Sequence, residues 1–107
     1  MSTLDRLRVD LRSALQAGDK VETSMIRTLI AAIENAGAIE ADTPVDPQIG
    51  LNHDRPRREL AESDVSRIVE RERAEVAEAA ASYRSLGLAD EAAELERRTD
   101  IVDRYLR

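Results

Sequence analysis

The side chains best suited to catalysis are few in this chain. The only histidine is His53, the only lysine is Lys20, and cysteine is absent. A serine nucleophile needs a histidine within hydrogen-bond reach, and His53 falls in a proline-punctuated stretch where we expect it to be solvated. Lys20 opens a predicted helix, which disfavours a buried lysine base. The missing cysteine excludes disulfides, thiolate-bound zinc and thiol catalysis.

The spacing of the remaining residues also disfavours a metal or a cofactor. A di-iron bundle needs Glu-x-x-His pairs that project inward, and His53 is not placed to supply one. The sequence contains no glycine-rich phosphate loop and no dinucleotide-binding fingerprint. We therefore predict no metal, no cofactor and no catalytic residues, so that the chain is not an enzyme by itself.

Length and composition favour one small helical domain. The 107 residues are 42% hydrophobic but contain no Phe or Trp, and a chain of this length forms a single domain. Alanine, leucine, glutamate and arginine are strong helix formers. The sequence has neither a signal peptide nor a long apolar run, which predicts a soluble cytoplasmic protein without membrane association.

The net charge of −6 argues against a broad electrostatic contact with nucleic acid. Affinity for nucleic acid comes mainly from the neutralisation of phosphates. Neither the first 40 residues, nor 41–63, nor 64–107 is basic as a segment. A local basic patch is still compatible with this distribution.

Two helices are predicted before residue 41. The first covers about 4–17, begins after an N-cap at Ser2 or Thr3 and stops at Gly18. The second starts at about residue 20, after a capping box formed by Asp19 and Glu22, and ends near Gly37 or slightly beyond. The short turn between the two helices predicts an antiparallel hairpin. The second helix has a wide apolar stripe formed by Val21, Met25, Ile26, Leu29, Ile30, Ile33 and Ala36.

The periodic pattern disappears between residues 41 and 62. Three prolines and Gly50 interrupt a polar stretch, which predicts a flexible loop or insert. Three arginines in this stretch, Arg55, Arg57 and Arg58, are a weak indication of an anion-binding segment.

A second hairpin is predicted after this loop. Ser63 or Asp64 is expected to cap a third helix, and Gly87 to end it in a left-handed conformation. A fourth helix follows at once, and the short connection requires an antiparallel pair. Both helices carry an a/d seam with steps of three and four: Val65, Val69, Glu72, Val76, Ala79, Tyr83 and Leu86, then Leu88, Ala92, Leu95, Thr99, Val102 and Leu106. The predicted fold is all-α, a small bundle of two antiparallel helical hairpins with a long loop between the second and third helices.

Glu72 interrupts the apolar seam of the third helix. In an antiparallel hairpin it is expected beside Val102, Asp103 and Arg104. One interpretation is that its carboxylate reaches solvent or Arg104 near the open end of the hairpin. The other is that it serves as a ligand or as an acid–base group. The charged run 67–75 contains oppositely charged pairs three or four residues apart, such as Arg67 with Glu70, which predicts a solvated face.

Arg27 is the clearest candidate binding residue. At 100° per residue it projects from the face of its helix opposite the apolar stripe, among small and polar neighbours that include Ser24 and Asn35. No carboxylate lies three or four residues away to pair with it. A guanidinium in such a place suits bidentate recognition of a phosphate, although a solvated or ion-paired arginine is an equally simple interpretation.

The order of several short motifs resembles the GatB/YqeY family, specifically its YqeY-like members. The residues that carry the resemblance are Leu7, Asp10, Leu11, Ala14, Ala17, Asp19, Ser24, Ile26, Arg27, Leu29, Ala32, Ile33, Asn35, Ala36, Glu72, Glu78, Ala79, Tyr83, Gly87, Asp90, Tyr105 and Leu106. The resemblance spans nearly the whole chain apart from 41–62. Members of this kind usually continue past the Tyr-Leu into a tail domain associated with tRNA, so the resemblance implies the N-terminal helical domain only. They also carry a basic stretch in the third helix, where this chain has Ala74, Glu75, Val76 and Ala77.

The resemblance implies a non-catalytic accessory module linked to glutamine-dependent amidation of aminoacyl-tRNA, a carbon–nitrogen ligase reaction. The expected partner is tRNA or an amidotransferase complex, and the candidate contacts are Arg27, Asn35, Arg55, Arg57 and Arg58. The alternative is a protein–protein adaptor or a homodimer that uses an exposed part of the heptad seam. An enzymatic role is compatible with the sequence only if the chain completes a site on another subunit.

Overall fold

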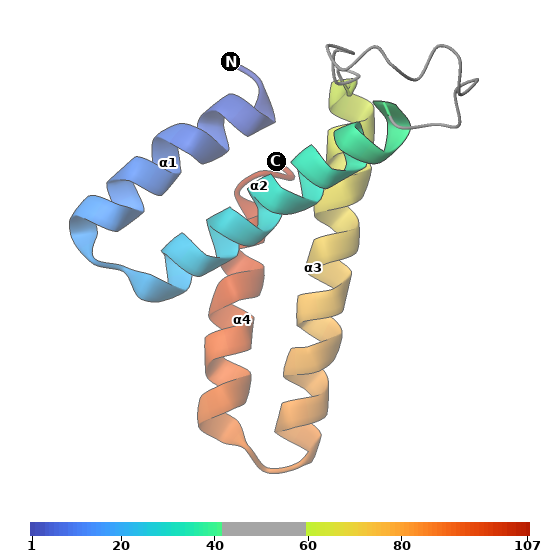
Figure 1. Cartoon of the computed structure of the whole chain (residues 1–107). Helices are drawn as coiled ribbons and strands as arrows, with labels where there is room; N and C mark the ends of the chain where they lie inside the picture. Colours follow the sequence, from blue (N-terminus) through green and yellow to red (C-terminus); the bar gives the residue numbers. More distant parts are fainter. Residues whose placement is uncertain (42–59) are drawn as a thin grey trace.

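The computed structural model describes residues 1–41 and 60–107, and for 39–41 the backbone alone. The described residues form four helices and no strand, which confirms the predicted all-α fold of two antiparallel hairpins (Figure 1). The helices are α1 (Thr3–Ala17), α2 (Lys20–Ala41), α3 (Glu62–Ser85) and α4 (Ala89–Asp103). The predicted loop 41–62 therefore begins and ends on helical residues, and α2 continues past Gly37.

Capping side chains and one left-handed glycine define the first hairpin. Ser2 caps α1, and its hydroxyl accepts a hydrogen bond from the Asp5 backbone N–H while Asp5 accepts one in return. Gly18 ends the helix with φ +69°, a conformation that costs other residues energy. Asp19 then accepts a hydrogen bond from the Glu22 N–H and caps α2, as predicted.

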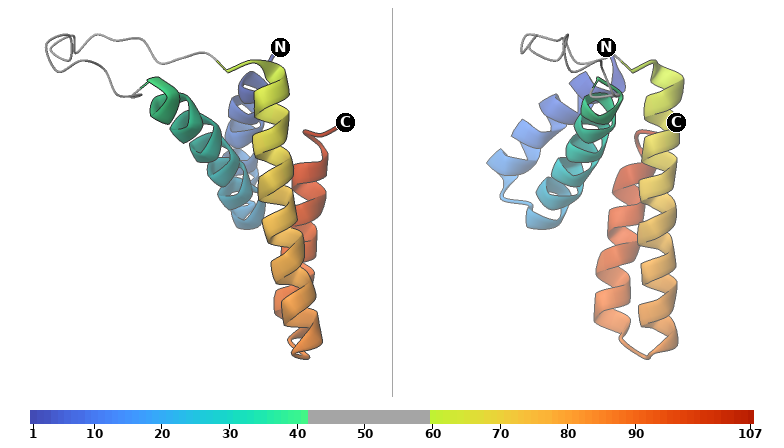
Figure 2. Two further views of the ribbon diagram at one scale, coloured as in Figure 1. Left: turned by 90° about the vertical axis from the view of Figure 1, so that its right-hand side faces the viewer. Right: turned by 45° about the vertical axis from the view of Figure 1, so that its right-hand side comes forward.

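The second hairpin turns through a Schellman motif at Gly87. This glycine has φ +79°, and its N–H donates to the Arg84 carbonyl at 3.1 Å. The Leu88 N–H donates to the Tyr83 carbonyl at 3.0 Å, which satisfies a second free carbonyl of α3. The predicted left-handed stop at Gly87 is therefore confirmed. In both views of Figure 2, α4 runs beside α3 along its whole length, and the first turns of the longer α3 extend beyond the end of α4.

The predicted start of the third helix is wrong by two or three residues. The helix begins at Glu62 after Ala61, which has no side chain that could cap it. Asp64 lies inside the first turn and pairs with Arg67 instead. The Glu62 carboxylate accepts a hydrogen bond of 2.7 Å from the Thr3 hydroxyl. A negative charge is favourable at the N-terminus of α1, so this tertiary contact helps to position the first turn of α3.

The core forms where α2 packs against the other three helices. It contains Leu7, Ala14, Met25, Ile26, Leu29, Ile33, Val65, Ile68, Val69, Ile101, Val102 and Tyr105. The α1–α2 pair lies against the half of the α3–α4 hairpin that is remote from its turn (Figures 1 and 2). The predicted seam is therefore buried only in part: Val69 and Val102 are fully buried, whereas Tyr83 and Leu86 at the turn are exposed.

The ion pair predicted between Arg67 and Glu70 is replaced by another, and a further arginine of the 67–75 run pairs outside its own helix. Arg67 pairs with Asp64, and Arg73 pairs with Asp103 across the hairpin. The pair with Asp103 ties α3 to α4 and holds the pKa of Arg73 above its usual value. The exposed positions of this run agree with the predicted solvated face, but Arg73 is paired across the hairpin and not within its own helix.

Candidate functional site

An open depression of about 600 Å³ lies along the outward face of α2. We call it the α2 groove. It is lined by Leu15, Gly18, Lys20, Thr23, Ser24, Arg27, Thr28 and Ala31. The end of α1 supplies the apolar wall, and the first three turns of α2 supply cations and hydroxyl groups.

Two cations of the α2 groove come from the same face of α2. Lys20 and Arg27 are seven residues apart, or about two helical turns, so both project to one side. Both side chains are exposed. Within residues 1–41 and 60–107, the hydrogen bonds and ion pairs leave Arg27 without a partner. The structure thus confirms that Arg27 lies opposite the buried stripe and adds that it faces a depression.

A third cation reaches the α2 groove from α4. The Arg98 guanidinium donates a hydrogen bond of 3.1 Å to the Ser24 hydroxyl. Thr28 donates its own hydroxyl to the Ser24 carbonyl at 3.0 Å, which leaves the Thr28 oxygen free to accept. Sequence reasoning missed Arg98 because it lies 74 residues from Ser24 and on the other hairpin.

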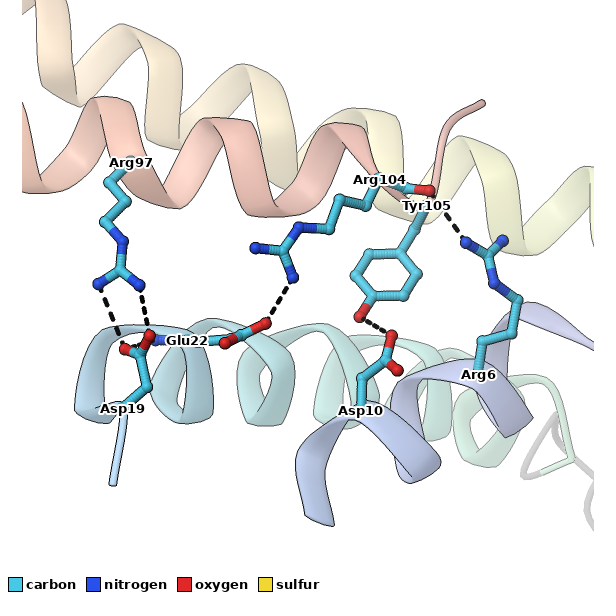
Figure 3. Close-up of polar contacts among 7 residues, drawn as sticks. All are labelled: Arg6, Asp10, Asp19, Glu22, Arg97, Arg104 and Tyr105. Atoms are coloured by element: carbon cyan, nitrogen blue, oxygen red, sulfur yellow. Dashed lines mark hydrogen bonds and ion pairs between the residues drawn. The ribbon is translucent and has the colours of Figure 1, made fainter. Parts of the chain in front are cut away.

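The two carboxylates that adjoin the lining residues of the α2 groove in the sequence are paired with arginines of the second hairpin. Asp19 pairs with Arg97, and Glu22 pairs with Arg104 (Figure 3). The hydrogen bond from Arg97 and that from the Glu22 backbone hold the pKa of the Asp19 carboxyl below its usual value. Each of these two carboxylates therefore has an arginine partner from the second hairpin, and neither makes an ion pair with Lys20 or Arg27 in the described residues.

Tyr105 has a structural position beside this network. Its hydroxyl donates a 2.5 Å hydrogen bond to Asp10, and its side chain is almost fully buried (Figure 3). The Arg6 guanidinium lies 5.3 Å from the centre of the ring and donates to the Arg104 carbonyl at 3.0 Å. Burial, together with the bond to Asp10, raises the pKa of the Tyr105 phenol. These contacts join α1 to the segment after α4, so Tyr105 has a packing role.

Two of the five predicted contact residues belong to the part of the chain that the structure describes, and one of these two lines the α2 groove. Arg27 lines it, whereas Asn35 is exposed farther along α2 and is not part of its lining. Arg55, Arg57 and Arg58 fall outside the described residues, as does His53. A group of three metal-ligating side chains does not occur in the part of the chain that the structure describes.

Of the two surroundings that the first interpretation offered for Glu72, solvent or Arg104, the structure does not show the pairing with Arg104. Arg104 is engaged with Glu22, and Glu72 lies half-buried on α3. Burial, and secondarily the charge of Glu75, raises the pKa of the Glu72 carboxyl, while Arg71 opposes the shift. The charged form is thus less favourable in the folded chain than in water.

Replacing Glu72 with glutamine should therefore stabilise the protein. Because the folded-state pKa is raised, the unfavourable contribution of the carboxylate is absent below the unfolded pKa of about 4.3 and grows as pH rises above it. We expect Glu72→Gln to raise Tm at pH 7, with a smaller difference at pH 4.5, in circular-dichroism melts. The control is Glu78→Gln, an exposed position of the same helix. A lower Tm for Glu72→Gln than for Glu78→Gln would contradict this account.

No family model, curated protein or solved structure matches this chain. The resemblance to the GatB/YqeY family therefore stays a prediction. No helix in the described ranges is both long enough and apolar enough to cross a membrane.

Proposed function

We propose that this chain is a non-catalytic helical binding module whose α2 groove receives an anionic group of its partner. The observation that carries the proposal is that Lys20 and Arg27 line one depression together with three hydroxyl side chains. Arg98 adds a third cation through its hydrogen bond to one of these hydroxyls, that of Ser24. These cations occur together in a chain whose net charge is −6. Since acidic residues outnumber basic ones in this chain, 22 to 16, an arginine placed at random would usually have a carboxylate nearby.

The lining of the α2 groove suits a phosphate group in particular. Arginine offers a planar pair of donors that matches phosphate oxygens, and lysine adds a compact charge. Serine and threonine hydroxyls are common additional phosphate contacts in nucleic-acid interfaces. A few phosphate contacts of this kind would orient the partner on the module without binding it tightly.

The GatB/YqeY resemblance makes tRNA the first partner to consider. On this proposal the module assists glutamine-dependent amidation of aminoacyl-tRNA, and the α2 groove contacts the tRNA backbone. The acidic remainder of the molecule would limit the interface to this groove and keep non-specific binding weak.

A filter-binding titration of the whole chain against bulk tRNA at about 50 and 200 mM salt tests this proposal. Neutralising three phosphates predicts a slope of log K against log salt of about −2 to −3. Absence of binding tighter than about 100 µM at the lower salt concentration would remove the RNA component. A slope near zero would also contradict phosphate recognition.

The second candidate function is a protein–protein adaptor or a homodimer. The exposed end of the α3–α4 hairpin favours the adaptor, because Leu86 is 73% exposed there. The inner seam residues, such as Val69 and Val102, are used within the monomer and are not available to a partner. Sedimentation velocity over a range of concentrations decides the homodimer: a constant monomer rules it out.

A further inference from the structure

The turn of the α3–α4 hairpin extends beyond the rest of the molecule. Figures 1 and 2 show α1 and α2 packed against the other half of this hairpin, with the turn projecting away from them. Every residue from 81 to 91 is exposed. We call this region, residues 81–91, the hairpin tip.

The hairpin tip presents apolar side chains to solvent. Three of the six exposed large hydrophobic residues in the described chain are Tyr83, Leu86 and Leu88. A contact between the residues at the positions of Tyr83 and Leu88 commonly accompanies a Schellman motif, so these two have a local role. The Leu86 side chain has no such local role. It is 73% exposed, and only the backbone of Leu86 takes part in the capping hydrogen bonds of the turn.

The hairpin tip is held in one conformation before any partner binds. Gly87 adopts the left-handed conformation, and two hydrogen bonds from Gly87 and Leu88 close the end of α3. Arg84 is held across the hairpin by its ion pair with Glu96. A partner therefore meets a prearranged apolar surface, which lowers the entropy cost of docking.

Acidic residues predominate on the parts of α3 and α4 that adjoin the hairpin tip. Between residues 74 and 96 there are six acidic residues and one basic residue, Arg84, which is already paired. The acidic residues, all exposed, are Glu75, Glu78, Asp90, Glu91, Glu94 and Glu96. This charge repels nucleic acid and anionic lipid, and it also repels a second hairpin tip. It complements a segment that carries lysine or arginine around apolar residues.

We infer that the hairpin tip docks a cationic amphipathic segment of a protein partner, with Leu86 in contact with its apolar face. This interaction is independent of the α2 groove, whose lining residues come from α2 and the end of α1 and include none of residues 81–91. The apolar contact at Leu86 supplies affinity. The carboxylates of the hairpin tip and of the adjoining helices select a cationic partner and speed its approach.

Fluorescence anisotropy with the whole chain tests the inference. The probe is a labelled helical peptide of about 18 residues with leucine on one face and lysine elsewhere. A matched peptide has glutamate in place of lysine. We expect the lysine peptide to bind and the glutamate peptide to bind at least about tenfold more weakly. We expect Leu86→Ser to weaken binding of the lysine peptide about tenfold.

The control variant is Val9→Ser. It makes the same kind of apolar-to-serine change at a residue of α1 that is 42% exposed and lies outside the hairpin tip. It should leave the affinity of the lysine peptide within about twofold. Equal binding of both peptides, or equal effects of the two variants, would overturn the inference. Self-association that Leu86→Ser abolishes in sedimentation would assign the hairpin tip to a second copy, and would equally overturn it.

Discussion

Replacing Tyr105 with alanine is expected to lower the free energy of unfolding by about 3 to 5 kcal/mol, the usual cost of removing a buried aromatic ring. The ring is 4% exposed and belongs to the core that joins the two hairpins. The change also leaves Asp10 without its hydrogen-bond donor and Arg6 without the ring it covers. Since a domain of this size is stable by about 5 to 15 kcal/mol, urea denaturation should show a large loss.

Two variants separate the causes of this loss. Tyr105→Phe keeps the ring but removes the bond to Asp10, and should cost about 1 to 2 kcal/mol. Tyr83→Ala is the matched control, because the same change at a side chain that is 39% exposed should cost much less. Equal losses for Tyr105→Ala and Tyr83→Ala would contradict the assignment of Tyr105 to the core.

The pH dependence of stability gives a separate measure of the Tyr105 contact. Because the folded-state pKa of Tyr105 is raised, its stabilising effect is present below the ordinary phenol pKa of about 10 and is lost as pH rises above it. The wild-type chain should therefore lose stability above about pH 10 more steeply than Tyr105→Phe. Urea midpoints at pH 8 and at pH 10.5 make this comparison.

Replacing Arg27 with glutamate is expected to weaken tRNA binding by at least about tenfold at low salt. The change removes one phosphate contact and places a negative charge in the α2 groove. Its effect on folding should be small, because Arg27 is exposed and lacks a partner in the described ranges. Filter binding measures the affinity, and a thermal melt checks that the fold is kept.

Arg71→Glu is the matched control for Arg27→Glu. It makes the same change of net charge at an exposed arginine on α3, outside the α2 groove. Any general effect of charge on tRNA binding is common to both variants, so their difference reports the α2 groove alone. Equal losses of affinity would show that the α2 groove has no special role.

Much of the fold follows from local signals in the sequence. Gly18 and Gly87 mark the two turns because each adopts a left-handed conformation. The period of the apolar residues on the second helix identifies the stripe that forms the centre of the core. The sequence predicts a start of the third helix that is too late. Ser63 is a strong capping residue by type, whereas the observed cap, Ala61, carries no polar group in its side chain.

The candidate site could be predicted only in part, because it combines two hairpins. Helical periodicity places Arg27 on the outward face of α2, but it cannot show that Arg98 of α4 reaches Ser24. The pairing of Asp19 with Arg97 and of Glu22 with Arg104 likewise depends on how one hairpin is rotated against the other. Spacing within one helix contains no information about that rotation.

Chemical-shift mapping of the isotope-labelled whole chain with tRNA tests the α2 groove most directly. The account predicts that the backbone amides of residues 20–31 and the guanidinium of Arg98 shift progressively, while those of the hairpin tip stay unchanged. Binding that leaves the α2 groove signals unmoved, or shifts confined to residues outside it, would contradict the account.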